Sequence, residues 1–209
     1  MNKVHLVTGG SSGIGACLVD RLRGRGDEVL APGRSELDLS DADSIAAWVR
    51  EAGIERLDAL VHCAGFVELG PVSAFQRDVW EATLAVNLLA PAQLTAALLP
   101  ALRAAAGAVV FVNSGAGINA NAQWSAYAAS KFGLRALADA LRSEEPEVRV
   151  TSVFPGRTAT RMQAEVHRQE GRDYDPSAWI HPDTVVDHIV AVLDLGSDAQ
   201  VPEIVIRPR

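Results

Sequence analysis

The sequence predicts an α/β fold in which a doubly wound parallel sheet of about seven strands carries helices on both faces. Short β-branched runs alternate with longer helical patterns, and this alternation is typical of parallel sheets covered by helices. The runs are 4–8, 28–31, 57–63, 108–113, 148–154 and 203–206. Residues 108–112 are apolar at every position, as expected of a central strand that is covered on two faces.

The composition suits a single domain spanning residues 1–209. The chain is 48% hydrophobic and 22% charged, with no low-complexity tract and no internal repeat. A net charge of −7 with scattered basic residues argues against nucleic-acid and anionic-membrane partners. The N-terminal apolar run is too short for a signal peptide, and no later run looks long enough to cross a bilayer. We therefore expect a cytoplasmic protein without a membrane partner.

Cysteine and histidine usage argues against a disulfide-linked protein and against a metal-binding protein. Cys17 and Cys63 are too few for a disulfide framework, so we expect buried thiols. The five histidines lack paired spacing and neighbouring cysteine pairs, so no metal site is expected.

Three segments define the rest of the architecture. The helices expected at 90–106 and 126–142 are rich in apolar and small residues, so they either meet another subunit in a homodimer or homotetramer or are buried within the monomer. Only residues 32–37 separate the second strand from Asp38 and Leu39, so one crossover helix is reduced to a turn. The polar region 161–182 predicts a short helix followed by a mobile loop.

A glycine-rich turn directly follows the first strand and opens a helix. Gly9 permits the tight turn, Gly13 lets the backbone approach a pyrophosphate, and Gly15 lets the helix pack closely on the sheet. Free amide groups at the helix start would face the phosphates. The same turn without a ligand is the alternative, but its place after the first strand favours a Rossmann-like nucleotide site. The residues expected to bind are Gly9, Ser11, Ser12, Gly13, Ile14 and Gly15.

The end of the second strand should decide which dinucleotide binds. NAD is usually held there by an acidic side chain, which residues 32–34 do not offer, whereas the guanidinium of Arg34 suits a 2′-phosphate. The sequence thus favours NADP(H). NAD(H) remains possible because Glu36 lies close enough to compete for the ribose, and a solvated loop arginine is the alternative for Arg34.

Tyr127 and Lys131 lie four residues apart, and Ser114 lies thirteen positions before the tyrosine. On a helix, this spacing places the two side chains on one face with Cβ atoms about 5–6 Å apart. A cation there would lower the pKa of the phenol from about 10 toward roughly 7 and prepare it to exchange protons. The pair alone leaves open a solvated helix face.

Together these residues make the chain resemble the short-chain dehydrogenase/reductase family over nearly its whole length. The motifs that match in order and spacing are Thr8 to Gly15 (TGxxxGxG), His62 to Gly65 (NNAG), Asn87, the set Ser114, Tyr127 and Lys131, and Pro155 with Gly156.

The resemblance implies a role for each matching position. Tyr127 would be the general acid or base, Lys131 would lower its pKa and bind the nicotinamide ribose, and Ser114 would position the substrate carbonyl. Asn87 would bind a water that resupplies the proton, with a buried asparagine at a helix break as the alternative. The implied cofactor contacts are Asp38 and Leu39 at the adenine, Ala64 and Gly65 at the adenosine ribose, and Pro155, Gly156, Thr158 and Thr160 near the nicotinamide or pyrophosphate.

Three features depart from the family pattern. His62 and Cys63 replace the two asparagines of NNAG, so their usual hydrogen bonds must be supplied otherwise. Thr158 replaces a branched apolar residue, although only its backbone is expected to meet the cofactor. The chain is also short, which predicts a modest lid after Thr160 and an open substrate site.

The predicted function is therefore an NADP(H)-dependent oxidoreductase that interconverts a carbonyl and an alcohol, acting as a carbonyl reductase on a small or hydrophobic molecule. Its substrate site would be formed by the loops after the strands and by segment 157–182, with Phe66, Trp124 and Met162 either shaping the pocket or serving the core. The alternative is a dinucleotide-binding sensor or scaffold without turnover. An extended epimerase or dehydratase would need more chain after Pro155.

Overall fold

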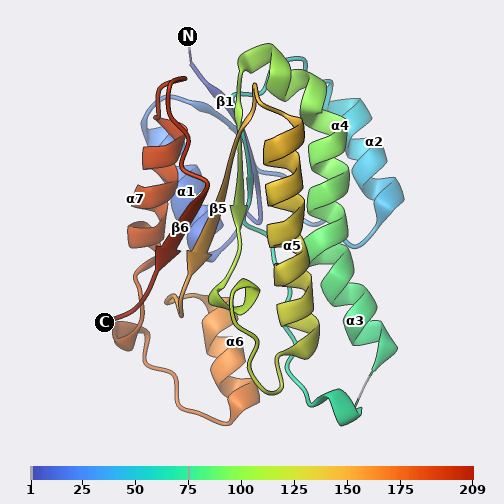
Figure 1. The fold of residues 1–209 in the computed structure, drawn as a ribbon, viewed down its shortest axis with the longest axis vertical. Coiled ribbons are helices and arrows are strands. Elements are labelled where there is room, and N and C mark those ends of the chain that lie inside the picture. The colour runs from blue at the N-terminus through green and yellow to red at the C-terminus, as the bar shows by residue number, and fades with distance from the viewer. Residues whose placement is uncertain (1, 75) are drawn as a thin grey trace.

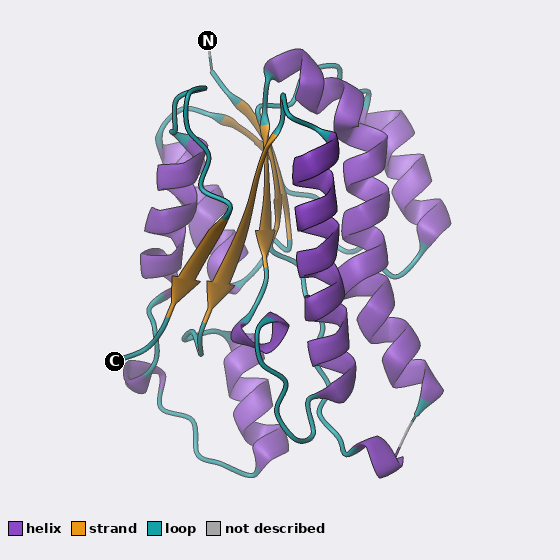
Figure 2. Ribbon diagram, viewed as in Figure 1, coloured by secondary structure: helices purple, strands orange, loops and turns teal. Residues whose placement is uncertain are grey.

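The computed structural model describes residues 2–74 and 76–209, which fold into a parallel sheet between two layers of helices (Figures 1 and 2). The strands in this part of the chain are β1 (Val4–Thr8), β2 (Glu28–Leu30), β3 (Ala59–His62), β4 (Ala108–Val112), β5 (Arg149–Pro155) and β6 (Glu203–Ile206). The α-helices are α1 (Gly13–Gly24), α2 (Ala42–Ala52), α3 (Arg77–Leu84), α4 (Ala90–Ala105), α5 (Ser125–Glu144), α6 (Arg161–Glu170) and α7 (Pro182–Leu193). Short 3₁₀ turns η1 (Val72–Ala74), η3 (Gly115–Gly117) and η4 (Pro176–Ala178) and a π-helical segment η2 (Ala85–Leu89) complete the secondary structure.

The sheet order is β2-β1-β3-β4-β5-β6, and all neighbours are parallel. The predicted fold class is confirmed, but the described residues form six strands instead of about seven. After β2 the amides of Glu36 and Leu37 bond to the Gly33 carbonyl in a turn. Leu37 is 4% exposed and fills the core from this turn. The segment before Asp38 is thus a turn, as the sequence predicts, and α2 forms the crossover to β3.

Apolar residues fill both sides of the sheet. Every residue of β4 is buried, as expected for a central strand covered on two faces. One core cluster joins α2, α4 and α5 to one face, and a second joins α1 and α7 to the other (Figure 1). Leu94, Leu98 and Leu134 are at most 2% exposed, so much of the apolar surface of α4 and α5 is buried within the monomer.

One helical stretch corrects a prediction about membranes. Among the described residues, Arg77–Ala105 form a stretch of 29 residues that is long and apolar enough to cross a bilayer by length and composition alone. The expectation that no later run is long enough is therefore wrong. A core helix passes the same test, and here α4 packs against α2 and β3.

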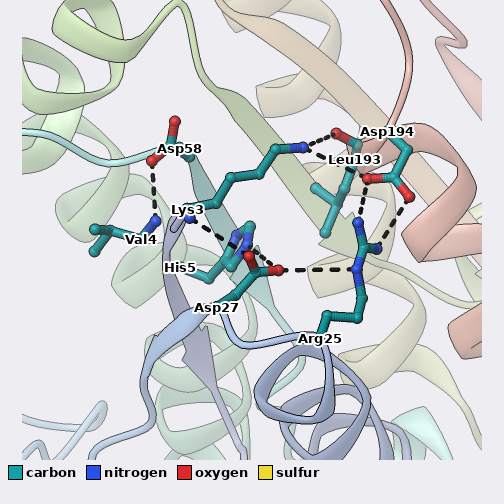
Figure 3. A network of polar contacts seen from close by, with 8 residues as sticks. All are labelled: Lys3, Val4, His5, Arg25, Asp27, Asp58, Leu193 and Asp194. Carbon is teal, nitrogen blue, oxygen red and sulfur yellow. Dashed lines mark hydrogen bonds and ion pairs between the residues drawn. The ribbon is translucent and has the colours of Figure 1, made fainter. Parts of the chain in front are cut away.

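Charged groups at the amino ends of the strands join β1, the turn between α1 and β2, and α7 (Figure 3). The Arg25 guanidinium donates to both carboxylate oxygens of Asp194 at 3.0 and 2.8 Å, and Lys3 lies 3.5 Å from the same carboxylate. The Nε2 of His5 lies 3.3 Å from Asp27. Burial lowers the pKa of His5 in spite of this neighbouring carboxylate. The network lies at the amino ends of the strands. The predicted site residues gather at the opposite edge, where the strands have their carboxyl ends.

Candidate active site

A cleft of about 660 Å³ lies at the carboxyl ends of the strands. Each predicted site residue except Asn87 lines it. These residues are Gly9, Ser11, Ser12, Gly13, Ile14, Gly15, Arg34, Asp38, Leu39, Ala64, Gly65, Ser114, Tyr127, Lys131, Pro155, Gly156, Thr158 and Thr160. The strands bring them together because parallel strands present all their carboxyl ends at one edge of the sheet.

The glycine-rich turn has the backbone geometry that the sequence predicts. Gly9 has φ +68°, and a Cβ at Gly15 would lie only 2.3 Å from the Gly9 carbonyl oxygen. The start of α1 therefore lies directly against the turn. The Ser12 side chain does not cap α1, so the first amide groups of the helix are available to an anion.

Ser114 is fixed at the end of β4 by its neighbour Asn113, which the sequence reasoning did not single out. The Ser114 amide donates to Asn113 Oδ1 at 2.8 Å, and Asn113 Nδ2 donates to the Lys131 carbonyl at 3.1 Å. The loop after β4 is thereby joined to α5, which carries Tyr127. Only the position of Asn113 directly before Ser114 could have pointed to this role.

Tyr127 is 6% exposed, and the side chain of Ser114 lies close enough to act on its pKa. Burial raises the pKa of the phenol above 10.0, and Ser114 offsets this only in part. The phenol is therefore protonated at neutral pH.

Lys131 is 3% exposed, and its Nζ donates to the Val112 carbonyl at 3.0 Å. It lies 5.8 Å from the Tyr127 ring centroid. Burial lowers the pKa of Lys131 from 10.5 to about 8. The expected lowering of the phenol pKa by Lys131 is wrong in this structure, because burial of Tyr127 is the dominant effect and the ammonium is directed to a carbonyl of β4.

Asn87 lies behind the cleft, in the π-helical segment η2 between α3 and α4. Its Oδ1 accepts from the Phe66 amide at 2.8 Å, and its Nδ2 donates to the Phe66 carbonyl at 2.8 Å and to Ser130 Oγ at 3.0 Å. The side chain is 1% exposed. Its amide thus fixes the start of the loop after β3, and any water held by Asn87 falls to its backbone carbonyl.

The opposite end of the cleft carries the charged residues after β2. The Arg34 side chain is 84% exposed and lies 3.6 Å from Asp38. Glu36, expected as a competitor for the ribose, instead accepts the Gly33 amide at 2.7 Å. Hydrogen bonds from the hydroxyl and amide of Ser40 are the main reason that the pKa of Asp38 is lowered. Ser40 also lines the cleft and was not predicted from the sequence.

The segment after β5 supplies residues 156–158 and 160–163 to the cleft, and its helix α6 lies below the carboxyl ends of the strands in Figure 1. Thr160 caps α6 by accepting the Gln163 amide at 3.2 Å, and its methyl group would lie 3.0 Å from a Cβ at Gly13. The expected short helix is α6 itself.

Beside Tyr127 the cleft is mostly apolar. Trp124 packs edge-on against the Tyr127 ring with centroids 5.7 Å apart, and Phe66 and Met162 also line the wall. The sequence indicates these three residues. It gives no sign of Val67, Ala116 and Val166, which come from three different elements and pack in one apolar cluster with Tyr127.

The two departures in the NNAG position have a structural account. His62 Nε2 lies 3.0 Å from Thr95 Oγ1, and its ring stacks on Phe111 at 5.1 Å. Burial lowers the pKa of His62 to about 3, so the imidazole is neutral. Cys63 lines the cleft as a free, half-buried thiol, and burial raises its pKa to about 12. Cys17 is likewise half-buried, so neither thiol is as fully buried as expected.

Fold and site together define an α/β oxidoreductase with a dinucleotide cleft. The short chain dehydrogenase family matches residues 34–171. Benzil reductase ((S)-benzoin forming) of Saccharomyces cerevisiae is 33% identical over 205 residues, which cover 82% of this chain and 77% of that protein. The chain therefore belongs to the short-chain dehydrogenase/reductase family, whose members are NAD(P)-dependent oxidoreductases.

Solved structures agree with this assignment. A short chain dehydrogenase from Shigella flexneri complexed with NADP is 25% identical, with a TM-score of 0.83 over 99% of this chain and 97% of that one. 4-Hydroxyisoleucine dehydrogenase complexed with NADH, 24% identical, shares the fold with a TM-score of 0.86 over 99% of this chain and 97% of that one.

Proposed function

We propose that the protein is an NADP(H)-dependent carbonyl reductase whose proton donor is Tyr127. The observation that carries the proposal is a protonated, buried phenol beside Ser114 in the same cleft as an uncapped, glycine-rich helix start. The glycine-rich turn fits a dinucleotide, because Cβ atoms at Gly9 and Gly15 would clash with Ala64 and with the Gly9 carbonyl, so that only glycine allows the tight turn whose free helix amides can face a pyrophosphate. When bound, the nicotinamide cofactor supplies or accepts the hydride.

The proton side of the reaction follows from the geometry of Tyr127. A phenol with a raised pKa keeps its proton at neutral pH and can donate it to a carbonyl oxygen that gains negative charge. Ser114 lines the same cleft beside the phenol, so both hydroxyls can meet the same oxygen and orient it. The Nζ of Lys131 lies 5.8 Å from the Tyr127 ring centroid in the same buried region, where it can bind the nicotinamide ribose. We assign resupply of the proton to Lys131 and the backbone of Asn87.

Arg34 is proposed to bind the 2′-phosphate of NADP(H). Its guanidinium is exposed and has only a long contact with Asp38 as an ion pair, so it can turn to a phosphate at little cost. Arg34→Ala should weaken NADPH binding roughly tenfold or more and leave NADH binding nearly unchanged, since a charged hydrogen bond contributes about 1.5–3 kcal/mol. Fluorescence titration with both cofactors measures this.

Arg77→Ala is the matched control for Arg34, because the Arg77 side chain is 83% exposed and, within residues 2–74 and 76–209, pairs with Glu81 on its own helix alone. It should change neither affinity. Equal losses for NADPH and NADH in Arg34→Ala would contradict the 2′-phosphate assignment.

The substrate is proposed to be a small or hydrophobic carbonyl compound. Val67, Ala116, Val166 and the Trp124 ring surround the Tyr127 phenol with apolar surface, which favours uncharged groups. The similarity to a benzil reductase makes aromatic ketones the first compounds to test.

A panel of aryl, alkyl and carboxylate-bearing carbonyl compounds should give NADPH consumption with the uncharged members and little with the carboxylates. Absorbance at the NADPH band measures the rate. Tight NADPH binding with no turnover across the panel would instead support a dinucleotide-binding sensor.

We also propose a cytoplasmic homodimer or homotetramer. Free thiols at Cys17 and Cys63 suit a reducing compartment. Leu89 and Phe132, from η2 and α5, are 60% and 42% exposed and supply apolar surface for contact between subunits.

A further inference from the structure

The helix α6 is joined to the two sides of the cleft by different contacts. Its residues Met162, Gln163 and Val166 line the cleft. The helix itself lies beyond the carboxyl ends of the strands (Figure 1). Whatever holds α6 in place therefore also holds one wall of the proposed substrate site.

One side is tied through the end of β5. Arg157 donates to both carboxylate oxygens of Glu170 at 2.9 and 2.7 Å, and its guanidinium lies 5.4 Å from the Trp179 ring centroid. The Ile180 amide donates to the Arg157 carbonyl at 3.1 Å, and the Ala159 amide donates to the Ile180 carbonyl at 2.8 Å. Both ends of the segment that carries α6 are thus joined to each other, and this junction forms a fixed base.

The other side is tied by the apolar cluster that Val166 shares with Val67 and Leu69 and by the amide side chain of Gln169. Its Oε1 accepts the Leu69 amide at 2.7 Å, across 100 residues of sequence. The loop that carries Leu69 is itself held at both ends, because Asn87 bonds both backbone groups of Phe66 and the Gly70 amide donates to the Gln123 carbonyl at 2.8 Å. Gln169 therefore docks α6 onto a wall that the rest of the fold keeps in place.

We infer that Gln169 is a positioning residue that latches α6 across the cleft, with residues 157–160 and 180 as the base about which α6 moves when the latch opens. The consequence for turnover rests on the proposed function, whereas the latch itself does not. When α6 moves away, Val166 and Met162 leave the substrate wall, while Tyr127, Ser114 and Lys131 keep their mutual contacts. The apparent affinity for substrate should then fall in proportion to the fraction of molecules in which α6 is still latched. The rate of the chemical step should stay the same.

Gln169→Ala tests the latch. Hydrogen exchange of the Leu69 amide should become faster, KM for the best carbonyl substrate should rise roughly threefold to tenfold, and kcat should stay within about twofold. Arg168→Ala is the matched control, because the Arg168 side chain bonds to Glu165 on the same helix and to no other side chain among the described residues. It should leave the Leu69 amide and both kinetic constants near the wild-type values.

A double substitution restores the contact in another form. Gln169 Nε2 donates to Glu165 Oε1 at 2.8 Å, so exchanging the two side chains in E165Q/Q169E keeps both the acceptor for Leu69 and the pair within the helix. Slow Leu69 exchange and a low KM should return in this variant.

The latch is refuted if Leu69 exchange or KM in Gln169→Ala matches Arg168→Ala, or if kcat falls while KM stays unchanged. If the wild-type protein reduces no carbonyl compound, the proposed function fails, and the exchange of the Leu69 amide still decides whether the latch exists.

Discussion

Replacing Tyr127 with phenylalanine should lower kcat by about a hundredfold to ten-thousandfold, which is the usual contribution of a general acid. Only the hydroxyl is lost, so the ring should keep its packing against Trp124 and the cofactor cleft should keep its shape. NADPH affinity should therefore stay close to that of the wild type. Steady-state rates with the best carbonyl substrate and NADPH titration measure the two effects separately.

The second tyrosine of the chain supplies the control. The Tyr174 hydroxyl lies 3.4 Å from the Thr160 carbonyl, a long contact, so Tyr174→Phe removes the same atom with little expected effect on kcat. Turnover of Tyr127→Phe within tenfold of the wild type would show that another group donates the proton.

Lys131→Met should abolish most turnover and make the protein more stable at neutral pH. Burial lowers the pKa of Lys131 from 10.5 to about 8, so the folded state holds its charge less favourably than the unfolded chain does. Below about pH 8 this difference costs roughly 3 kcal/mol of stability. Loss of the hydrogen bond to the Val112 carbonyl lowers the stability of the variant by about 1 kcal/mol and offsets part of this gain. Urea unfolding at pH 7 should therefore show a free energy of unfolding higher by about 1–3 kcal/mol.

The sign of the pH dependence gives an internal check. As the pH rises from about 8 through 10.5, first the folded and then the unfolded lysine loses its proton, so the advantage of Lys131→Met should disappear. Lys3→Met is the control, because Lys3 is half-exposed and pairs with Asp194. Lys3→Met should not raise the free energy of unfolding at pH 7. A lower stability of Lys131→Met at that pH would contradict the cost assigned to the buried charge.

Local chain geometry accounts for what the sequence could predict. The glycines at 9 and 15 have close approaches that only a residue without a Cβ tolerates, so their spacing indicated the turn directly. Runs such as 108–112 indicated the central strand because burial on two faces demands apolar residues at every position.

Other features depend on contacts between distant segments. Helical spacing placed Tyr127 beside Lys131 but gave no measure of how deeply either is buried, and burial decides both pKa values. The contact between Gln169 and Leu69 spans 100 residues and has no local signature.

The charge network of Figure 3 has a consequence for engineering. It fastens β1 to α7 at one edge of the sheet, while the cleft, Gln169 and the loop after β3 lie at the other. Libraries that vary the exposed positions within residues 66–70 and 161–180 for new substrates should therefore lose few members to misfolding, and selection for activity alone can rank them. Changes at Arg25, Asp27 or Asp194 should have the opposite profile, reducing the yield of folded protein without altering which carbonyl compound is accepted.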